Sequence, residues 1–190
     1  MEANKQSSPW VGRLVSLTLL AAVVIGTWTW TNGLTYETPI VLESEAAREA
    51  LRDLRKVAPG ETVSMSVGSD RLWIMETGFG LPEPDGTWIE RRQASLVIEP
   101  PAGASRSLTL FVYPLLGEGK TSRSIAVSSG FESVSADLTG GGQEVVVRLG
   151  DTGTQVIEIS CDSLDSPAEL GLGPDERSLC AKLISISLSE

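Results

Sequence analysis

Histidine is absent from this 190-residue chain, and its absence excludes several kinds of functional site at once. Histidine is the commonest general base in enzymes and the commonest protein ligand of zinc and iron. No Ser-His-Asp arrangement, Cys-His arrangement or histidine-based metal site can therefore be built within the chain. Without a paired cysteine motif to replace it, we expect no metal and no cofactor.

Cysteine is almost as scarce, since Cys161 and Cys180 are the only two. In an oxidising compartment they can form a disulfide that closes a loop of about 20 residues, worth about 3 kcal/mol in the chain-entropy model. Two buried free thiols on neighbouring strands fit the sequence equally well, because the sequence does not fix the distance between their Cα atoms. The disulfide is therefore one of two interpretations.

Positive charge is in deficit, with 15 Lys and Arg against 25 Asp and Glu and a net charge of −10. Residues 1–36 hold only Glu2, Lys5 and Arg13, so the rest of the chain carries −11. An acidic domain repels nucleic-acid phosphates, so we expect no nucleic-acid partner. The length beyond residue 36 suits one domain with its own core.

Charge of either sign is missing from residues 14–36. The more apolar part, from Leu14 to about Thr31, spans ~27 Å as a helix, close to the thickness of a bilayer core. Trp28 and Trp30 suit an interfacial aromatic belt. The run predicts a transmembrane helix over 14–36 that contacts the lipid bilayer, after a cytoplasmic N-terminus at 1–13. A cleaved signal peptide is the alternative, although no small-x-small cleavage pattern follows at a suitable distance.

Basic residues precede the run and acidic residues follow it. The positive-inside rule therefore places the long C-terminal part outside the cytoplasm. For a bacterial chain this predicts a single-pass protein of the inner (cell) membrane, with its C-terminal domain periplasmic or extracellular. A linker over 37–60 comes next and contains a short helix over 44–58, with an apolar stripe of Ala47, Leu51 and Leu54 and a Pro-Gly stop.

From residue 61 to 190 the hydrophobic period changes from 3.6 to 2, and Gly- and Pro-rich turns recur. There is no repeat and no alternation of strands with helices. The fold class expected is all-β, an antiparallel β-sandwich of the jelly-roll kind. The expected strands are Thr62–Val67, Leu72–Met75, Ser95–Glu99, Ser107–Tyr113, Ser122–Ser128, Phe131–Ala136, Glu144–Leu149, Gln155–Ser160 and Leu179–Leu188.

Two segments break the strand-and-turn pattern: 78–88, GFGLPEPDGTW, and 166–179, SPAELGLGPDERSL. Together they resemble paired motifs of a β-sandwich domain attached to bacterial membrane glycosyltransferases and phosphoglycerol transferases of envelope glycan synthesis. The resemblance covers about residues 61–190. Gly173 and Cys180 depart from the family pattern, where serine and glycine are usual. The resemblance implies glycan binding or accessory support, not catalysis.

The candidate glycan-binding residues are Glu83, Trp88, Asp175 and Arg177. Carboxylates and guanidinium can make bidentate hydrogen bonds to sugar hydroxyls, while Trp88 can stack on a pyranose ring. A purely structural interpretation is also open, with Trp88 in the core, Glu83 and Arg177 as an ion pair between two loops, and Asp175 capping a turn.

Two further kinds of site have weaker support. Asp162, Asp165, Glu169 and Asp175 are dense enough to suggest calcium, but no EF-hand spacing is present. Paired carboxylates can hydrolyse glycosides, but no pair is marked out here, so we expect no enzyme activity.

The sequence thus predicts a membrane-anchored, non-catalytic accessory protein whose extracytoplasmic sandwich binds or positions envelope polysaccharide. The alternative hypothesis is a structural subunit of a larger membrane complex, respiratory or photosynthetic for example, that stabilises its protein partners through its helix and its domain. Under either hypothesis we expect membrane protein partners.

Overall fold

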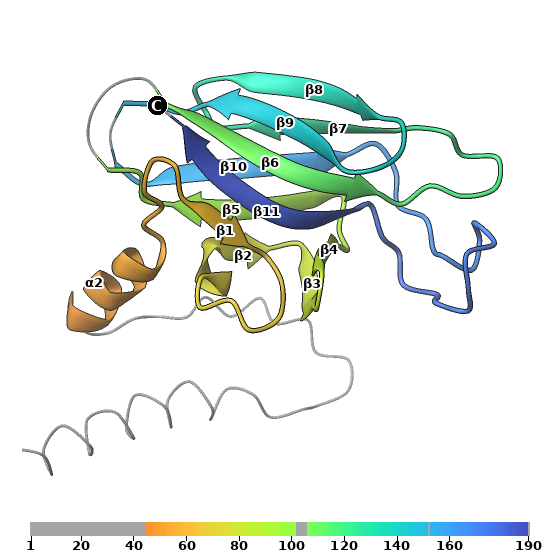
Figure 1. Cartoon of the computed structure of the whole chain (residues 1–190), viewed down its shortest axis with the longest axis horizontal. Helices are drawn as coiled ribbons and strands as arrows, with labels where there is room; N and C mark the ends of the chain where they lie inside the picture. Colours follow the sequence, from red (N-terminus) through yellow and green to blue (C-terminus); the bar gives the residue numbers. More distant parts are fainter. Residues whose placement is uncertain (1–44, 102–105, 152, 190) are drawn as a thin grey trace, which may run out of the picture. The chain divides into compact units, whose positions relative to one another are not determined.

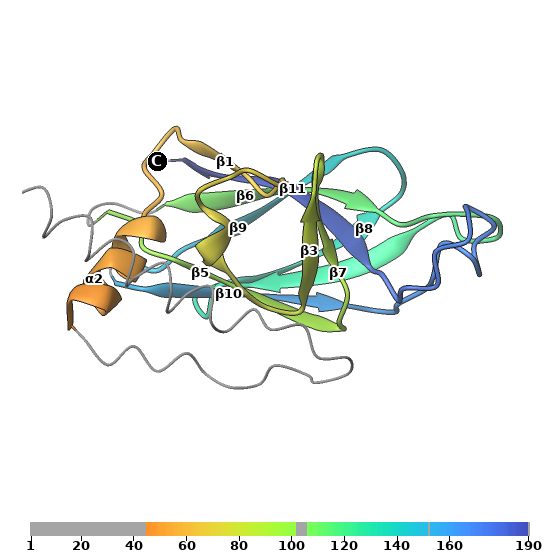
Figure 2. The ribbon, with the colours of Figure 1, turned by 90° about the horizontal axis from the view of Figure 1, so that it is seen from below.

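The computed structural model describes residues 45–101, 106–151 and 153–189, which form two antiparallel β-sheets packed face to face (Figures 1 and 2). The expectation of an antiparallel β-sandwich is confirmed. The predicted transmembrane segment, residues 14–36, lies outside the described residues. Among the residues that are described, none belongs to a helix with the length and apolar character that crossing a bilayer requires.

One sheet has six strands in the order β3-β4-β11-β6-β9, with β1 paired to the end of β11. The last strand of the chain, β11, therefore lies inside this sheet. Its neighbours are β4, from the first half of the chain, and β6, from the middle of the chain. The bounds are β1 Thr62–Ser64, β3 Phe79–Glu83, β4 Gly86–Ile89, β6 Ser107–Pro114, β9 Gln143–Arg148 and β11 Ala181–Ser189.

The other sheet has five strands in the order β2-β5-β10-β7-β8. Several connections carry the chain from one sheet to the other. The two sheets therefore enclose one core, and the strands within each sheet pair antiparallel. The bounds are β2 Met75–Thr77, β5 Gln93–Ile98, β7 Arg123–Ser128, β8 Ser133–Leu138 and β10 Gln155–Cys161.

The core lies between the sheets and follows the alternation seen in the sequence. In β6, Leu108, Leu110 and Val112 are fully buried, while the residues between them face outward. In β10, Ile157 and Ile159 occupy the same core. Burial of alternate residues on both sheets is the main stabilising term here, at roughly 25 cal/mol for each Å² of apolar surface removed from water.

The helix α2 spans Glu45–Leu54 and is shorter than the predicted 44–58. It ends early because the following residues pair with the sandwich, where the Glu99 N–H donates to the Arg55 carbonyl at 2.9 Å. Its stripe of Ala47, Leu51 and Leu54 is partly buried. Figure 1 places α2 and the end of β11 at one end of the sandwich, opposite the long β10–β11 and β6–β7 loops.

The expected strand Leu72–Met75 is wrong over most of its length, because Leu72–Ile74 form the 3₁₀ turn η1 and β2 begins only at Met75. The chain turns there as it crosses from β1 in one sheet to β2 in the other. The strands β3 and β4 were not expected, because Gly80 and Pro82 are poor strand residues. Pro82 is tolerated because β3 is an edge strand.

Candidate functional site

The β10–β11 loop, residues 162–180, contacts the β3–β4 hairpin through the guanidinium group of Arg177. Its Nη2 donates to Glu83 Oε1 at 3.0 Å and to Asp175 Oδ2 at 2.7 Å. Its Nη1 donates to Glu90 Oε1 at 3.3 Å. The ion pair predicted between Glu83 and Arg177 is therefore present, and Asp175 caps its own turn because Oδ1 accepts the Arg177 N–H at 2.9 Å.

Lys182 of β11 joins the same cluster from the sheet. Its Nζ donates to Glu83 Oε2 at 2.9 Å and to Asp85 Oδ1 at 2.8 Å. The same ammonium lies 4.7 Å from the centre of the Trp88 ring, and the Trp88 indole N–H donates to Glu83 Oε2 at 3.2 Å. We call these four carboxylates and two cations the ionic network: Glu83, Asp85, Glu90, Asp175, Arg177 and Lys182.

The strand register explains why these side chains meet. Lys182 lies directly opposite Trp88 on β4 and opposite Tyr113 on β6, so the three side chains form one row on the outer face of the six-stranded sheet. The β3–β4 turn brings Glu83 and Asp85 to the end of this row. Gly86 permits the turn, because its φ is +144° and an added Cβ would lie 2.6 Å from the Leu183 carbonyl oxygen.

A second glycine makes room for Glu90. A Cβ on Gly80 would lie 2.1 Å from Glu90 Oε1, so the absent side chain leaves the space that this carboxylate occupies. Both glycines belong to the 78–88 segment singled out in the sequence. Gly80 therefore makes room for the ionic network, whereas Gly86 and Gly78 allow the segment to pack closely on Leu183 and Ala94.

Opposite charges hold the network in its ionised form. A hydrogen bond from Lys182 is the main cause that lowers the pKa of Glu83 and the pKa of Asp85. The hydrogen bond from Arg177 likewise lowers the pKa of Asp175 and raises the pKa of Arg177 itself. Burial alone would lower the pKa of Lys182, but its bonds to Asp85 and Glu83 outweigh burial and raise it.

The two aromatic residues of the row differ in exposure. Trp88 is partly buried and packs against Leu115, Leu170 and Leu179, a small cluster separate from the main core. Tyr113 is 49% exposed. Trp88 therefore lies on the outer face of the sheet and supports the β10–β11 loop; it is not a core residue between the sheets. Tyr113 is the aromatic residue of the row whose ring is accessible to a ligand.

Each of the carboxylates suggested for calcium is bonded to other groups of the protein. Asp165 binds Lys120 and Arg123, Glu169 accepts the Ser166 N–H at 2.8 Å, and Asp162 accepts the Ser163 N–H at 2.7 Å. Within the ranges that the structure describes, no group of three or more acidic or cysteine side chains is arranged to hold a metal ion. Glu169 and Ser166 instead form a reciprocal cap, since the Glu169 N–H donates to Ser166 Oγ at 3.2 Å.

The structure brings all four predicted residues, Glu83, Trp88, Asp175 and Arg177, into one place. Sequence reasoning missed Lys182, Glu90, Asp85 and Tyr113. A signal existed for Lys182, which is the single charged residue among the apolar and small residues of β11. Of the two interpretations of Cys161 and Cys180, the disulfide is the one observed, with Cα atoms 6.3 Å apart.

No protein-family model matches the chain, and no curated protein matches it in sequence. Similar solved structures include the CBM36-1 domain of a multidomain xylanase from the hindgut metagenome of Trinervitermes trinervoides, with 15% identity, a TM-score of 0.41, and coverage of 68% of this chain and 96% of that one. A CBM36 carbohydrate-binding module in complex with calcium and xylotriose has 15% identity and a TM-score of 0.41, with 68% and 99% covered.

A third similar structure is CBM35 from Cellvibrio japonicus Abf62, with 11% identity, a TM-score of 0.40, and coverage of 68% of this chain and 94% of that one. These structural neighbours are carbohydrate-binding modules. At such identities and TM-scores, the case for a function at this site depends on its own contacts.

Proposed function

We propose that the chain is a non-catalytic, membrane-anchored accessory protein whose extracytoplasmic sandwich binds envelope glycan on the outer face of the six-stranded sheet. The observation that carries this proposal is the row of Trp88, Lys182 and Tyr113, which ends at the ionic network. A half-exposed aromatic ring beside several fixed hydrogen-bonding groups is the composition that sugar recognition requires. In this arrangement the apolar face of a pyranose stacks on Tyr113.

The hydrogen-bonding capacity that remains in the network favours an uncharged glycan. Arg177 and Lys182 are bonded to carboxylates, whereas Asp85 keeps a side chain that is 70% exposed. Four carboxylates against two cations leave a local charge of −2, which repels uronate and phosphate groups. Sugar hydroxyls donate to carboxylate oxygens without this cost.

The same electrostatics disfavour catalysis. A glycosidase needs one carboxyl group whose pKa is raised, so that it can donate a proton near neutral pH. The pKa values of Glu83, Asp85 and Asp175 are all lowered by their cationic partners. These carboxylates therefore remain ionised and act as hydrogen-bond acceptors.

The membrane part of the proposal rests on the uncharged run 14–36 and on its charge asymmetry. The paired motifs at 78–88 and 166–179, which resemble domains of envelope-glycan transferases, support the envelope as the location. The proposed location is therefore a bacterial cell membrane, with the sandwich outside the cytoplasm.

A matched pair of substitutions tests the site. Tyr113→Ala should reduce retention of the protein in gels that contain neutral envelope polysaccharide by about tenfold in affinity. Phe131→Ala, which removes another exposed ring (65%) from a different turn, should leave retention unchanged. Equal retention of wild type and Tyr113→Ala, or equal loss in both variants, would contradict glycan binding on this face.

The second candidate function is a structural subunit of a larger membrane complex. Val67 and Leu81 favour it, because these apolar side chains near the edge strand β3 are 60% and 69% exposed. The Val67 N–H donates to the Glu83 carbonyl at 2.9 Å, so this edge lies next to the network. Co-purification of membrane partners at fixed stoichiometry in mild detergent would support this candidate over glycan binding. The substitution Leu81→Ser should then abolish that co-purification.

A further inference from the structure

The base of the β10–β11 loop is joined covalently at both ends. Cys161 ends β10 and Cys180 directly precedes β11, so their disulfide links the two points where the loop leaves the sandwich. Both residues are buried, with 8% and 0% of their surface exposed. The backbones of Asp165 and Leu179 add two hydrogen bonds across the base, at 3.0 and 2.9 Å.

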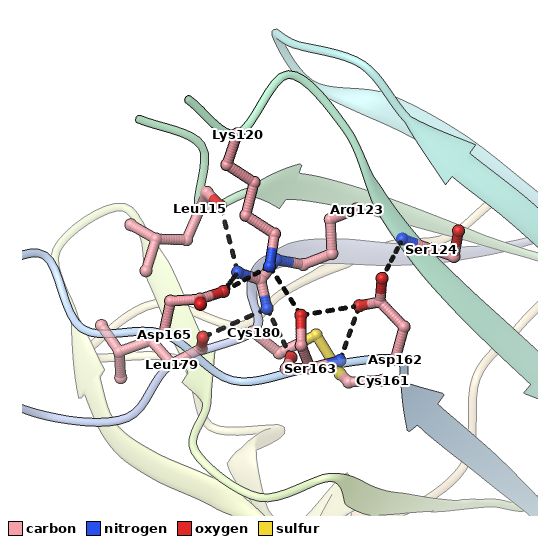
Figure 3. Close-up of a disulfide and its surroundings, with 10 residues drawn as sticks. All are labelled: Leu115, Lys120, Arg123, Ser124, Cys161, Asp162, Ser163, Asp165, Leu179 and Cys180. Atoms are coloured by element: carbon pink, nitrogen blue, oxygen red, sulfur yellow. Dashed lines mark hydrogen bonds and ion pairs between the residues drawn. A yellow bond between two sulfur atoms is a disulfide. The ribbon is translucent and has the colours of Figure 1, made fainter. Parts of the chain in front are cut away.

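Arg123 fastens the same base from a third segment (Figure 3). It is the first residue of β7 and is fully buried. Its Nη1 donates to the Ser163 and Leu179 carbonyls, and its Nη2 donates to the Leu115 carbonyl at 3.3 Å and to the Asp165 carboxylate. One side chain thus connects both ends of the loop to the neighbouring β6–β7 loop.

Stability alone does not account for a buried arginine at this position. Its Nε has no hydrogen-bond partner among the described residues, and removal of a charge from water costs several kcal/mol. Burial alone would raise the pKa of Asp165, but Lys120 and Arg123 outweigh it and lower that pKa. Buried ion pairs fix one conformation in some proteins, and the contacts of Arg123 with both ends of the loop and with Leu115 suit that role here.

Arg177 lies close in sequence to the fastened base, on a loop that packs against its neighbours. Arg177 is three residues before Cys180, and Leu170 at the far side of the loop packs with Leu179 and Trp88. A Cβ on Gly117 would lie 2.5 Å from the Leu170 carbonyl oxygen, which shows how closely the β6–β7 loop supports this one. We expect a displaced base to move Arg177 away from Glu83 and Glu90.

We propose that Arg123 and the Cys161–Cys180 disulfide are positioning groups for the glycan site, which hold the β10–β11 loop so that Arg177 completes the ionic network. This inference rests on the proposed function for its effect on affinity. It does not depend on that function for its effect on the loop, because the position of the loop is measurable without a ligand.

The test compares hydrogen exchange in the detergent-solubilised full chain and three variants. Cys161→Ala/Cys180→Ala removes the covalent link, and Arg123→Met/Asp165→Asn removes the buried cation together with its carboxylate. Arg148→Met is the control, because the Arg148 side chain is 65% exposed and its one ion pair among the described residues is with Glu132 at 3.6 Å. Each double variant should speed exchange in residues 166–178 by about tenfold or more, while β6 amides stay protected.

Affinity for neutral polysaccharide should fall by about tenfold in both double variants and stay unchanged in Arg148→Met. Unchanged exchange in residues 166–178 would overturn the positioning role, and so would an equal rise in β6, which would indicate general destabilisation. If the Arg123→Met/Asp165→Asn variant fails to fold, the exchange rates of the Cys161→Ala/Cys180→Ala variant still test the positioning role. A wild type that binds no polysaccharide would end the proposed function but leave the exchange result valid.

Discussion

At the scale of single residues, Glu83 connects the sheet to the loop because its two carboxylate oxygens accept from different elements. Oε1 accepts from Arg177 in the β10–β11 loop, and Oε2 accepts from Lys182 in β11 and from the Trp88 indole. The residues expected to touch sugar therefore also hold the protein together. For Glu83 the structural interpretation is confirmed by these contacts, and the sugar-binding interpretation stays a prediction.

Trp88 provides the first prediction at this scale. Trp88→Ala should lower the free energy of unfolding by about 2–4 kcal/mol, because the ring packs against Leu115, Leu170 and Leu179 and carries the Lys182 ammonium. Urea denaturation followed by circular dichroism measures this change. Phe131→Ala is the control and should stay within about 0.5 kcal/mol. Equal stability of the Trp88 variant and the wild type would refute a packing role.

Some of these residues were predictable from the sequence because they lie in two unusual motifs. Others were missed because they lie in regular strands. Glu83, Trp88, Asp175 and Arg177 stand in segments that break the strand pattern. Arg123 was missed although its signal is simple: it is in phase with Ile125 and Val127, the buried residues of β7. A charged residue in phase with a core stripe is a sign of a buried ion pair.

At the scale of elements, the strands with regular alternation were predictable and the irregular hairpin was not. The bounds expected for the strands from β5 to β11 agree with the observed ones to within two residues, because each of these strands has one apolar face. The β3–β4 hairpin contains Gly80, Pro82 and Gly86, and its position depends on contacts with β11 and Glu90 that no local pattern reveals.

The hairpin also provides the prediction at this scale. Gly86→Ala should cost about 2–3 kcal/mol, because the new Cβ meets the Leu183 carbonyl oxygen and the backbone has φ +144°. Gly130→Ala is the matched control, since Gly130 has φ +76° but nothing within 4 Å of the added atom. Thermal unfolding should show a clearly larger loss for Gly86. Equal losses would mean that close packing on β11 does not matter.

At the scale of the whole molecule, stability should depend on acid pH in a direction set by the lowered pKa values. Glu83, Asp165 and Asp175 have ordinary values of 4.5, 3.8 and 3.8 and lie lower when folded. These three groups contribute their full stabilisation of the folded state when the pH is above their ordinary pKa values. That contribution is lost as the pH falls through their lower pKa values in the folded protein. Lys182, whose pKa is raised, contributes fully until the pH exceeds its ordinary value of 10.5.

The midpoint of thermal unfolding should therefore stay level from neutral pH down to about 5 and then fall as the solution becomes more acidic. Glu83→Gln should reduce the part of this fall that begins near the ordinary glutamate value of 4.5. Glu158→Gln, at an exposed position on β10, should follow the wild-type profile. A midpoint that rises on acidification would contradict the ionised network.

The proposed function depends on glycan binding to the row of Trp88, Lys182 and Tyr113. Amide and indole nuclear magnetic resonance spectra of the detergent-solubilised full chain, titrated with neutral envelope oligosaccharide, test it most directly. Binding on this row should give saturable shifts at the Trp88 indole N–H and at the amides of Tyr113 and Lys182, with the five-stranded sheet unchanged. Shifts confined to the five-stranded sheet, or no shifts at saturating oligosaccharide, would contradict it.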